Sequence, residues 1–422
     1  MRVSISELTK AVQKVKSFAE TIKQAPGIMF DINGDTMSVC YSDGKKSIIE
    51  KLGVLGDEGD VQGRIVVGYN RFLNIIDICQ SSGGINTEDI DISFLDGNIM
   101  NIEVVKTMSV QRATGNTTED GEPEYVEESK VVSKFSQKIN YERPSDNLRY
   151  GILDRMDYEK IFEDNGDVCD IWDTAELKKI LSKTSNEKGK TVYLSSKVEA
   201  GFVVNLSHVV VIPTDSCVSS GFSVSTSVAK SLMDILSKID DDQVRVIRQD
   251  RYVSIINGTD TVGIWFEIAP VSKTDLSTLE QYRDKAYDTF EMVFSRAALS
   301  NVVNCASANT KEEKTYLTFN EIDGYKSLII SSSNSASYSG DFYVVIEGNQ
   351  EEIKNWEQLS VAKLPVSLRV LKAMIDDCDS VYISMDIMYN EQGCYMRLAE
   401  ALGRDEDGRI KLGATHYTVS SK

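Results

Sequence analysis

The sequence predicts an α+β protein built from three similar domains, each with two helices packed on antiparallel sheets. Two observations lead to this fold class. A segment made of a short apolar strand, a helix and further strands occurs three times along the 422 residues. An amphipathic helix followed by strand-rich chain precedes each copy of that segment. Diverged repeats larger than a solenoid unit indicate similar domains.

Amphipathic helices that open the repeats are predicted at residues 6–23, 173–186 and 295–310, because their apolar residues recur at helical spacing. In the first helix these residues are Leu8, Val12, Val15, Phe18 and Ile22. In the other two they are Leu177, Ile180, Leu181 and Thr184, and then Leu299, Val302, Val303 and Ala306.

The second part of each repeat is predicted at residues 65–105, 222–268 and 362–399. Each copy opens with an apolar strand and continues with a helix that begins near a cap-forming Asn or Ser. Two alternating strands then surround a polar turn, which reads LDGN, INGTD or YNEQG. The three capping residues are Asn70, Ser227 and Ser367.

The repeats predict three domains, at residues 1–147, 148–275 and 276–422. Two stretches fall outside the repeated pattern. The acidic residues 113–129 are expected to form a mobile loop or an extended ribbon at the end of the first domain. Residues after Ala399 are expected to be a polar C-terminal extension, in which His416 is solvated.

Composition argues against most catalytic and metal-binding classes. The chain has two histidines, and no pair of its seven cysteines forms C-x-x-C. Zinc ligands therefore have no suitable spacing, and we expect no enzyme activity, no metal and no cofactor. A strand-rich enzyme with a site among its many carboxylates stays open as an alternative.

Cysteine usage and hydropathy also indicate a compartment. The odd cysteine count indicates reduced thiols and hence a cytoplasmic protein. The N-terminus has no signal-peptide pattern, and no stretch reaches the ~18 apolar residues of a membrane span. We therefore expect no membrane partner.

Charge is unevenly distributed between the helices and the rest of the chain. The formal net charge is −19, yet each of the six predicted helices is neutral or positive. One interpretation is that lysines simply favour solvated helices. The other is that the helices line a surface that faces phosphate. The second interpretation predicts DNA contacts at Lys10, Lys14, Lys178, Lys179, Lys183, Lys230, Arg296, Arg369 and Lys372.

Three domains with this order of elements, and a late strand that reads CYMRLA, resemble the bacterial-type DNA polymerase sliding clamp, or beta subunit. The resemblance implies the DNA-clamp fold, in which two three-domain subunits close head to tail into a ring. Helices would line the hole and sheets would form the outer wall. The implied function is that of a processivity factor. A homodimer encircles double-stranded DNA without sequence preference and tethers DNA polymerase and the clamp loader through short linear motifs.

The resemblance also implies a hydrophobic groove that takes those motifs. One wall would be the strand with Tyr395, Met396 and Leu398, and Pro270 would lie on the far side. The alternative is that Met396 and Leu398 are core residues of the last strand.

The sequence departs from the family in two ways. An Asp-Gly-His-Arg-Leu-like turn of the middle domain is missing from residues 198–213, and the chain continues beyond the Arg-Leu pair. Such divergence suits a clamp from a phage or plasmid replicon. A rival interpretation is a clamp-like structural or adaptor protein that no longer encircles DNA.

Overall fold

The computed structural model describes residues 1–19, 27–42, 46–54, 63–82, 89–117, 123–143, 161–162, 168–184, 190–195, 200–204, 208–213, 221–249, 251–270, 277, 292–309, 315–334, 338–348, 350–353, 356–390 and 393–420. The chain forms two compact units. Unit 1 contains Met1–Lys178 and Lys230–Ile268, and unit 2 contains Lys179–Ala229 and Ala269–Lys422.

One order of elements occurs three times: a strand, a helix, four strands, a second helix and three strands. The first repeat consists of β1 (Arg2–Ser4), α1 (Ile5–Ala19), β2 (Gly27–Asn33), β3 (Thr36–Ser42), β4 (Lys46–Gly53), β5 (Gly63–Gly68), α2 (Tyr69–Ser82), β6 (Asp89–Leu95), β7 (Ile99–Thr117) and β8 (Pro123–Asn140). The second consists of β9 (Val168–Asp173), α3 (Thr174–Thr184), β10 (Thr191–Ser195), β11 (Ala200–Val204), β12 (His208–Pro213), β13 (Phe222–Ser225), α4 (Thr226–Leu236), β14 (Gln243–Arg248), β15 (Tyr252–Asn257) and β16 (Val262–Glu267).

The third repeat keeps this order and adds two short helices between its fourth and fifth strands. Its elements are β17 (Met292–Ser295), α6 (Arg296–Asn309), β18 (Thr315–Ile322), β19 (Tyr325–Asn334), β20 (Tyr338–Val345), η4 (Gln350–Glu352), α7 (Trp356–Ser360), β21 (Leu364–Val366), α8 (Leu368–Asp376), β22 (Tyr382–Asn390), β23 (Gly393–Arg404) and β24 (Ile410–Ser420). The predicted α+β fold class is confirmed. The domain boundaries near residues 147 and 275 stay a prediction.

Each unit contains one eight-stranded and one four-stranded antiparallel sheet. In unit 1 the strand orders are β5-β2-β3-β4-β16-β15-β14-β9 and β1-β6-β7-β8. In unit 2 they are β13-β10-β11-β12-β24-β23-β22-β17 and β20-β19-β18-β21. Each eight-stranded sheet therefore joins four strands of one repeat to four strands of the next.

The two joints between repeats are built alike. In unit 1, Lys46–Glu50 of β4 lies opposite Val262–Phe266 of β16. In unit 2, His208–Val211 of β12 lies opposite Thr415–Thr418 of β24. In both joints the fourth strand of one repeat pairs with the last strand of the next. We call this arrangement a repeat joint.

The first helix of each repeat begins in the same way. The Ser4 hydroxyl, the Asp173 carboxylate and the Ser295 hydroxyl each accept a hydrogen bond from a backbone N–H three residues later. These caps satisfy N–H groups that have no partner inside the helix. The residue before each cap is a large buried apolar one, Val3, Trp172 or Phe294. The predicted apolar faces of α1, α3 and α6 are confirmed. Every described residue of these faces is buried except Val302, which is partly buried, and Ile22 lies outside the described residues.

Two of the second helices, α2 and α4, each begin one residue before their predicted caps. Asn70 and Ser227 lie inside α2 and α4, and the side chain that caps α4 is Ser225, whose hydroxyl accepts the Val228 N–H. Ser367 does stand at the N-cap of α8, but its side chain makes no capping hydrogen bond. In α4 the adjacent Ser225, Thr226 and Ser227 are all cap-forming residue types, so the sequence alone does not single out the cap.

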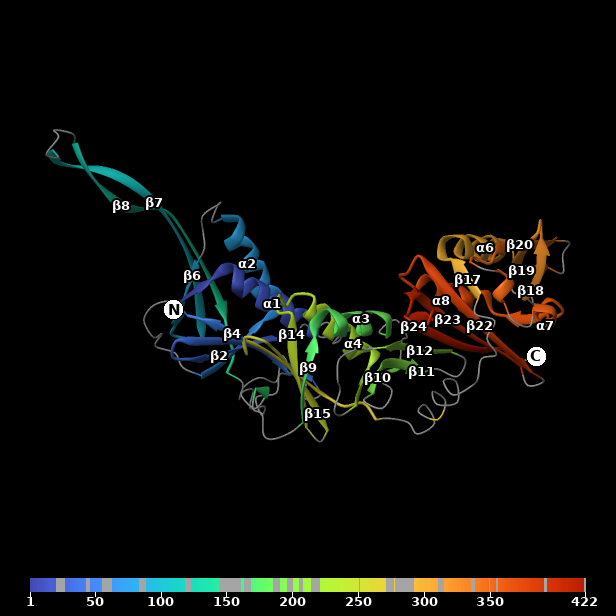
Figure 1. The fold of residues 1–422 in the computed structure, drawn as a ribbon. Coiled ribbons are helices and arrows are strands. Elements are labelled where there is room, and N and C mark those ends of the chain that lie inside the picture. The colour runs from blue at the N-terminus through green and yellow to red at the C-terminus, as the bar shows by residue number, and fades with distance from the viewer. Residues whose placement is uncertain are drawn as a thin grey trace. The chain divides into compact units, whose positions relative to one another are not determined.

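The acidic segment 113–129 belongs to an extended ribbon rather than to a loop. β7 and β8 pair continuously from Ile99 opposite Asn140 to Thr117 opposite Pro123, with two register shifts. Figure 1 shows this ribbon projecting from the remainder of the sheet that it shares with β6. Residues 118–122 lie outside the described residues.

The interpretation of the chain after Ala399 as an extension is wrong. Residues 410–420 form β24, which lies between β12 and β23 in the eight-stranded sheet of unit 2. His416 is therefore not solvated: its side chain is 1% exposed, and its Nε2 lies 3.4 Å from Asp377 Oδ2. The repeated pattern predicts two strands after each second helix, whereas the structure has three.

Candidate functional site

The nine predicted DNA contacts differ in how far they reach solvent. Lys10, Lys179, Lys230, Arg369 and Lys372 are exposed, and Lys178 and Arg296 are half-buried. Lys14 and Lys183 are buried. Seven of the nine therefore remain available on the first and second helices of the repeats.

Lys14 points into the protein, which contradicts its predicted role as a phosphate contact. Its Nζ lies 2.7 Å from Glu50 Oε1, and both side chains are less than a tenth exposed. Burial raises the pKa of Glu50, and the hydrogen bond and charge of Lys14 oppose that rise. The pair links α1 to β4, on which the helix packs.

Lys183 of α3 is held in the same way and does not fit the predicted role either. Its Nζ lies 2.9 Å from Asp379 Oδ2 and 3.6 Å from Glu400 Oε1, and it donates a hydrogen bond to the Asp377 carbonyl. Burial disfavours the charge of Lys183, but the bond to Asp379 and the charges of Asp377 and Glu400 outweigh this and raise its pKa.

Glu400 is the carboxylate at the centre of this cluster. It is 1% exposed and accepts hydrogen bonds from the backbone N–H groups of Asp379 and Ala414. A buried carboxylate with these partners forms a structural network that fixes the loop between α8 and β22 against β23 and β24. The cluster therefore stabilises unit 2 and does not form a nucleic-acid surface.

The sequence contained a signal for these two buried lysines. Each lies ten residues after the N-cap of its helix, at the same position in α1 and α3. Three residues before each of them is a buried apolar residue, Ala11 or Ile180. Residues three apart share a helix face, so both lysines belong to the edge of the buried stripe.

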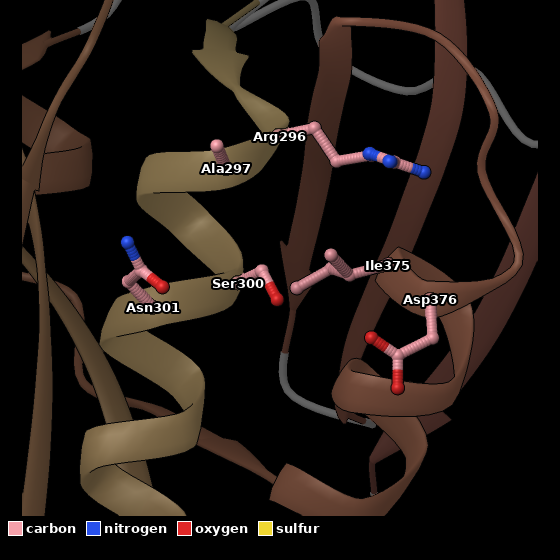
Figure 2. A pocket seen from close by; sticks show the side chains of 6 residues that line it. All are labelled: Arg296, Ala297, Ser300, Asn301, Ile375 and Asp376. Atoms are coloured by element: carbon pink, nitrogen blue, oxygen red, sulfur yellow. The ribbon is translucent and has the colours of Figure 1, made fainter.

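Arg296 lies at the start of α6, beside a small pocket between α6 and α8. The pocket has a volume of about 250 Å³ and is lined by Arg296, Ala297, Ser300, Asn301, Ile375 and Asp376. In Figure 2 the Arg296 side chain extends from α6 toward the side of the pocket formed by α8. Its guanidinium donates a hydrogen bond to the Cys378 carbonyl, and a guanidinium has five N–H donors, so the side chain is oriented and can still donate to an anion.

Lys238, just beyond α4, is a cation that is not among the nine predicted DNA contacts. It is exposed, and its Nζ donates to the Ser17 hydroxyl of α1 at 2.5 Å. The contact ties the end of a second helix to the first helix of the preceding repeat, at the repeat joint of unit 1. Only the tertiary structure brings these two residues together, because they are distant in sequence.

The predicted groove residues divide into accessible and buried ones. Pro270 is exposed and Tyr395 is half-buried. Met396 and Leu398 are 2% and 0% exposed and belong to the main hydrophobic core of unit 2. The expectation that their strand is the last of the chain is wrong, since β23 lies between β22 and β24.

Strands β8 and β20 stand at the ends of their sheets in this chain. β20 is the counterpart of β4 and β12, and β8 is the counterpart of β16 and β24, by their place in the order of elements. Large apolar residues on or beside β20 are exposed: Tyr325 by 57%, Tyr343 by 51% and Val345 by 36%. An edge strand that carries such residues is a candidate surface for strand pairing with another chain.

No group of three or more His, Cys, Asp and Glu side chains among the described residues could hold a metal ion. None of the described helices is long and apolar enough to cross a membrane.

The repeated joints, the paired helices and the order of strands define the sliding-clamp fold, which the chain shares with solved bacterial clamps over its whole length. No protein-family model and no curated protein matches the sequence.

The solved structures include the DNA polymerase sliding clamp from Pseudomonas aeruginosa, at 11% identity and a TM-score of 0.68. They also include the beta subunit of DNA polymerase III from Thermotoga maritima, at 12% and 0.66, and the beta subunit from DNA polymerase of Streptococcus pyogenes, at 11% and 0.68. Each comparison covers 100% of this chain and 99% of the other. The predicted resemblance to the bacterial clamp is thus confirmed at the level of the fold.

Proposed function

We propose that this protein is a sliding clamp, a processivity factor without enzymatic activity. Two copies close head to tail around duplex DNA and tether DNA polymerase, the clamp loader and other replication proteins. The observation that carries the proposal is the repeat joint. It is made twice within the chain, and its two strands occur once more at sheet ends, as β20 and β8.

Pairing of β20 in one copy with β8 in another would make the same joint a third time. Such a contact is heterologous, because it uses different surfaces of the two copies. Heterologous contacts form a closed ring when the rotation that relates one copy to the next brings the last copy back to the first. The exposed Tyr343 and Val345 on β20 support this assignment, since pairing would cover them. Two three-domain copies then give a six-domain ring, in line with the fold that the chain shares with bacterial clamps.

Exposed cations on the helices support the DNA-binding part of the proposal. A chain of net charge −19 repels DNA except where cations are gathered. Side chains such as Lys10, Lys179 and Lys372 would touch phosphates loosely and carry no sequence information. Buried free thiols at Cys79 and Cys378 fit a reducing cytoplasm.

Partner proteins would bind through short apolar motifs in a groove next to Pro270 and Tyr395, which are the accessible members of the predicted set. Met396 and Leu398 would support such a groove from within the core rather than line it.

Retention on DNA tests the proposal directly. Light scattering should give about twice the chain mass of 47.0 kDa. Protein loaded on a nicked circle should stay bound in high salt, and cutting the circle with a restriction enzyme should release it. Equal retention on circular and linear DNA, or a monomer at micromolar concentration, would favour the alternative of a clamp-like adaptor that does not encircle DNA.

A further inference from the structure

The ribbon of β7 and β8 is far longer than its place in the sheet requires. β6 pairs with β7 only at Ile99–Glu103. From Val104 to Thr117, β7 is paired with β8 alone among the described strands. At ~3.4 Å per residue, this free part of the ribbon is about 45 Å long. We call it the arm, and it comprises residues 104–117 and 123–134.

The arm has no counterpart in the other two repeats. The equivalent hairpin of the second repeat, β15 and β16, turns directly after Asn257. A two-stranded ribbon is at best marginally stable in water without a surface to pack on. We therefore expect the arm to pack on a partner surface. Because the arm continues directly from the part of β8 that lies in the sheet, the position of β8 indicates where that surface lies.

Alignment of the repeats places β8 relative to the joint. β16 pairs with β15 at Gly263–Glu267, and β8 pairs with β7 near the sheet at 136–140 in the equivalent way. The joint residues Val262–Phe266 of β16 thus correspond to Phe135–Ile139 of β8. The arm begins where these joint residues end.

The direction of the joint strands shows where the arm continues. In the unit 1 joint, the first residue of β16, Val262, lies opposite Glu50, toward the C-terminal end of β4. By the same antiparallel rule, the N-terminal side of β8 lies toward the C-terminal end of β20, which is Val345. The arm of one copy would therefore run past that end of the partner's β20.

The surface at this end of β20 suits such an occupant. The exposed Tyr343 and Val345 lie on β20, and Val345 pairs with Ser327, two residues after the exposed Tyr325. These three residues form the tyrosine end of the four-stranded sheet. Asp341 and Glu347, on and after β20, are exposed carboxylates. In the sequence, the parts of the arm nearest the sheet contain Lys106, Lys130 and Lys134, so an acidic partner surface suits the composition of the arm.

The insertion in the third repeat lies next to the tyrosine end. η4 and α7 follow β20, and Lys326 holds both: its Nζ donates to the Gln350 carbonyl at 2.6 Å and lies 5.1 Å from the Trp356 ring centroid. Among the described residues, the arm and this insertion each occur in one repeat, and the joint between copies would bring them together.

We propose that the arm of one copy crosses the joint between copies and packs on the tyrosine end of the second copy's third repeat, beside η4 and α7. This inference rests on the proposed ring, because its partner is a second copy of the chain. The arm adds a second contact, on the tyrosine end of the partner copy, to the single pair of strands in the joint. This additional contact slows dissociation of the ring.

Cross-linking locates the arm. A photoreactive benzoylphenylalanine at Gln111 is irradiated in a mixture of ¹⁴N and ¹⁵N protein, so that links between copies carry mixed labels. We expect mixed-label links to residues between Tyr325 and Glu357. Links confined to one copy, in a protein that is dimeric by mass, overturn the arm contact and leave the ring intact.

Dissociation measures what the arm contributes. In one variant an Asn-Gly turn replaces residues 106–133 and joins the paired Val105 and Lys134. We expect it to dimerise through the remaining joint with a Kd raised about tenfold or more. Tyr325→Ser should raise the Kd in the same direction, and Tyr382→Ser, a similarly exposed tyrosine on β22, is the matched control.

The outcomes separate the two proposals. An unchanged Kd in both the arm variant and Tyr325→Ser overturns the arm contact alone. A wild-type protein that is monomeric at every concentration overturns the ring and the arm contact together.

Discussion

Lysines one turn apart on the first helices of the repeats differ in whether they reach solvent or are buried in ion pairs. Lys10 and Lys14 are one helical turn apart in α1, yet Lys10 is exposed and Lys14 is buried against Glu50. Lys179 and Lys183 repeat the contrast in α3. Residues four apart share a helix face. What decides which lysine reaches solvent is therefore the structure packed beside that part of the helix, which is Glu50 for Lys14 and the Asp379–Glu400 cluster for Lys183.

The Lys14–Glu50 pair gives a prediction for stability. Lys14→Ala leaves the Glu50 carboxylate buried without its cation, so it should cost about 3–5 kcal/mol of the free energy of unfolding. The double variant Lys14→Met/Glu50→Leu replaces the pair with apolar side chains and should be close to neutral. Denaturant unfolding of the three proteins measures this. An equal loss in both variants would mean that packing, and not charge, dominates at this site.

Glu50 also gives a prediction for pH. Burial raises its pKa in the folded state above the ordinary value of 4.5. The stability that this group contributes is therefore fully present below its unfolded pKa, and it is lost as the pH rises through the folded pKa. The double variant Lys14→Met/Glu50→Leu should lack this decrease between pH 4 and neutrality. Melting curves across that range provide the test, and a decrease of the same size in the variant would assign it to other carboxylates.

At the scale of elements, the three strands after each second helix determine where each repeat ends and which strand forms its joint. The last strand of each trio is β8, β16 or β24, and it is the strand that forms a repeat joint or, in β8, the free edge. Residues 123–129 of the acidic segment and residues 410–420 of the supposed extension therefore belong to the same strand of their repeats, β8 and β24. β23 becomes a central strand as a result.

The central position of β23 predicts the outcome of Leu398→Ala. Leu398 is fully buried in the core of unit 2, so its truncation should cost about 2–5 kcal/mol and lower the melting temperature. Tyr395→Ala, on the same strand but half-buried, should change stability less and weaken binding of a partner peptide more. If Leu398→Ala instead left the melting temperature unchanged and abolished peptide binding, Leu398 would be a groove residue after all.

At the scale of the whole molecule, the balance of charge determines how DNA would be held. Six of the predicted contacts outside the Arg296 pocket are exposed or half-buried, and they stand on helices of a strongly acidic chain. Loose phosphate contacts of this kind give weak affinity with a steep dependence on salt.

The salt dependence of DNA binding tests these contacts one at a time. Lys179→Ala or Lys372→Ala should each lower the slope of log K against log salt by roughly 0.9, the effect of one lost phosphate contact on duplex DNA. Lys363→Ala is the matched control, because it removes an exposed lysine outside the helices and should leave the slope unchanged. A control slope that falls as much as the others would show that overall charge, and not the exposed helix surface, governs binding.

The sequence by itself determined the class of fold, the threefold order of helices and strands, and the buried faces of the first helices. These features depend on local periodicity, as the buried Leu8, Leu177 and Leu299 show. Only the tertiary structure decided that β24 completes the third repeat, which carboxylates hold Lys14 and Lys183, and that Met396 and Leu398 lie in the core. Each of these outcomes depends on which strand pairs with which over long sequence separations, such as β12 with β24. Local periodicity carries no information about such partners, because a strand that is buried between two others has the same pattern as a strand at an edge.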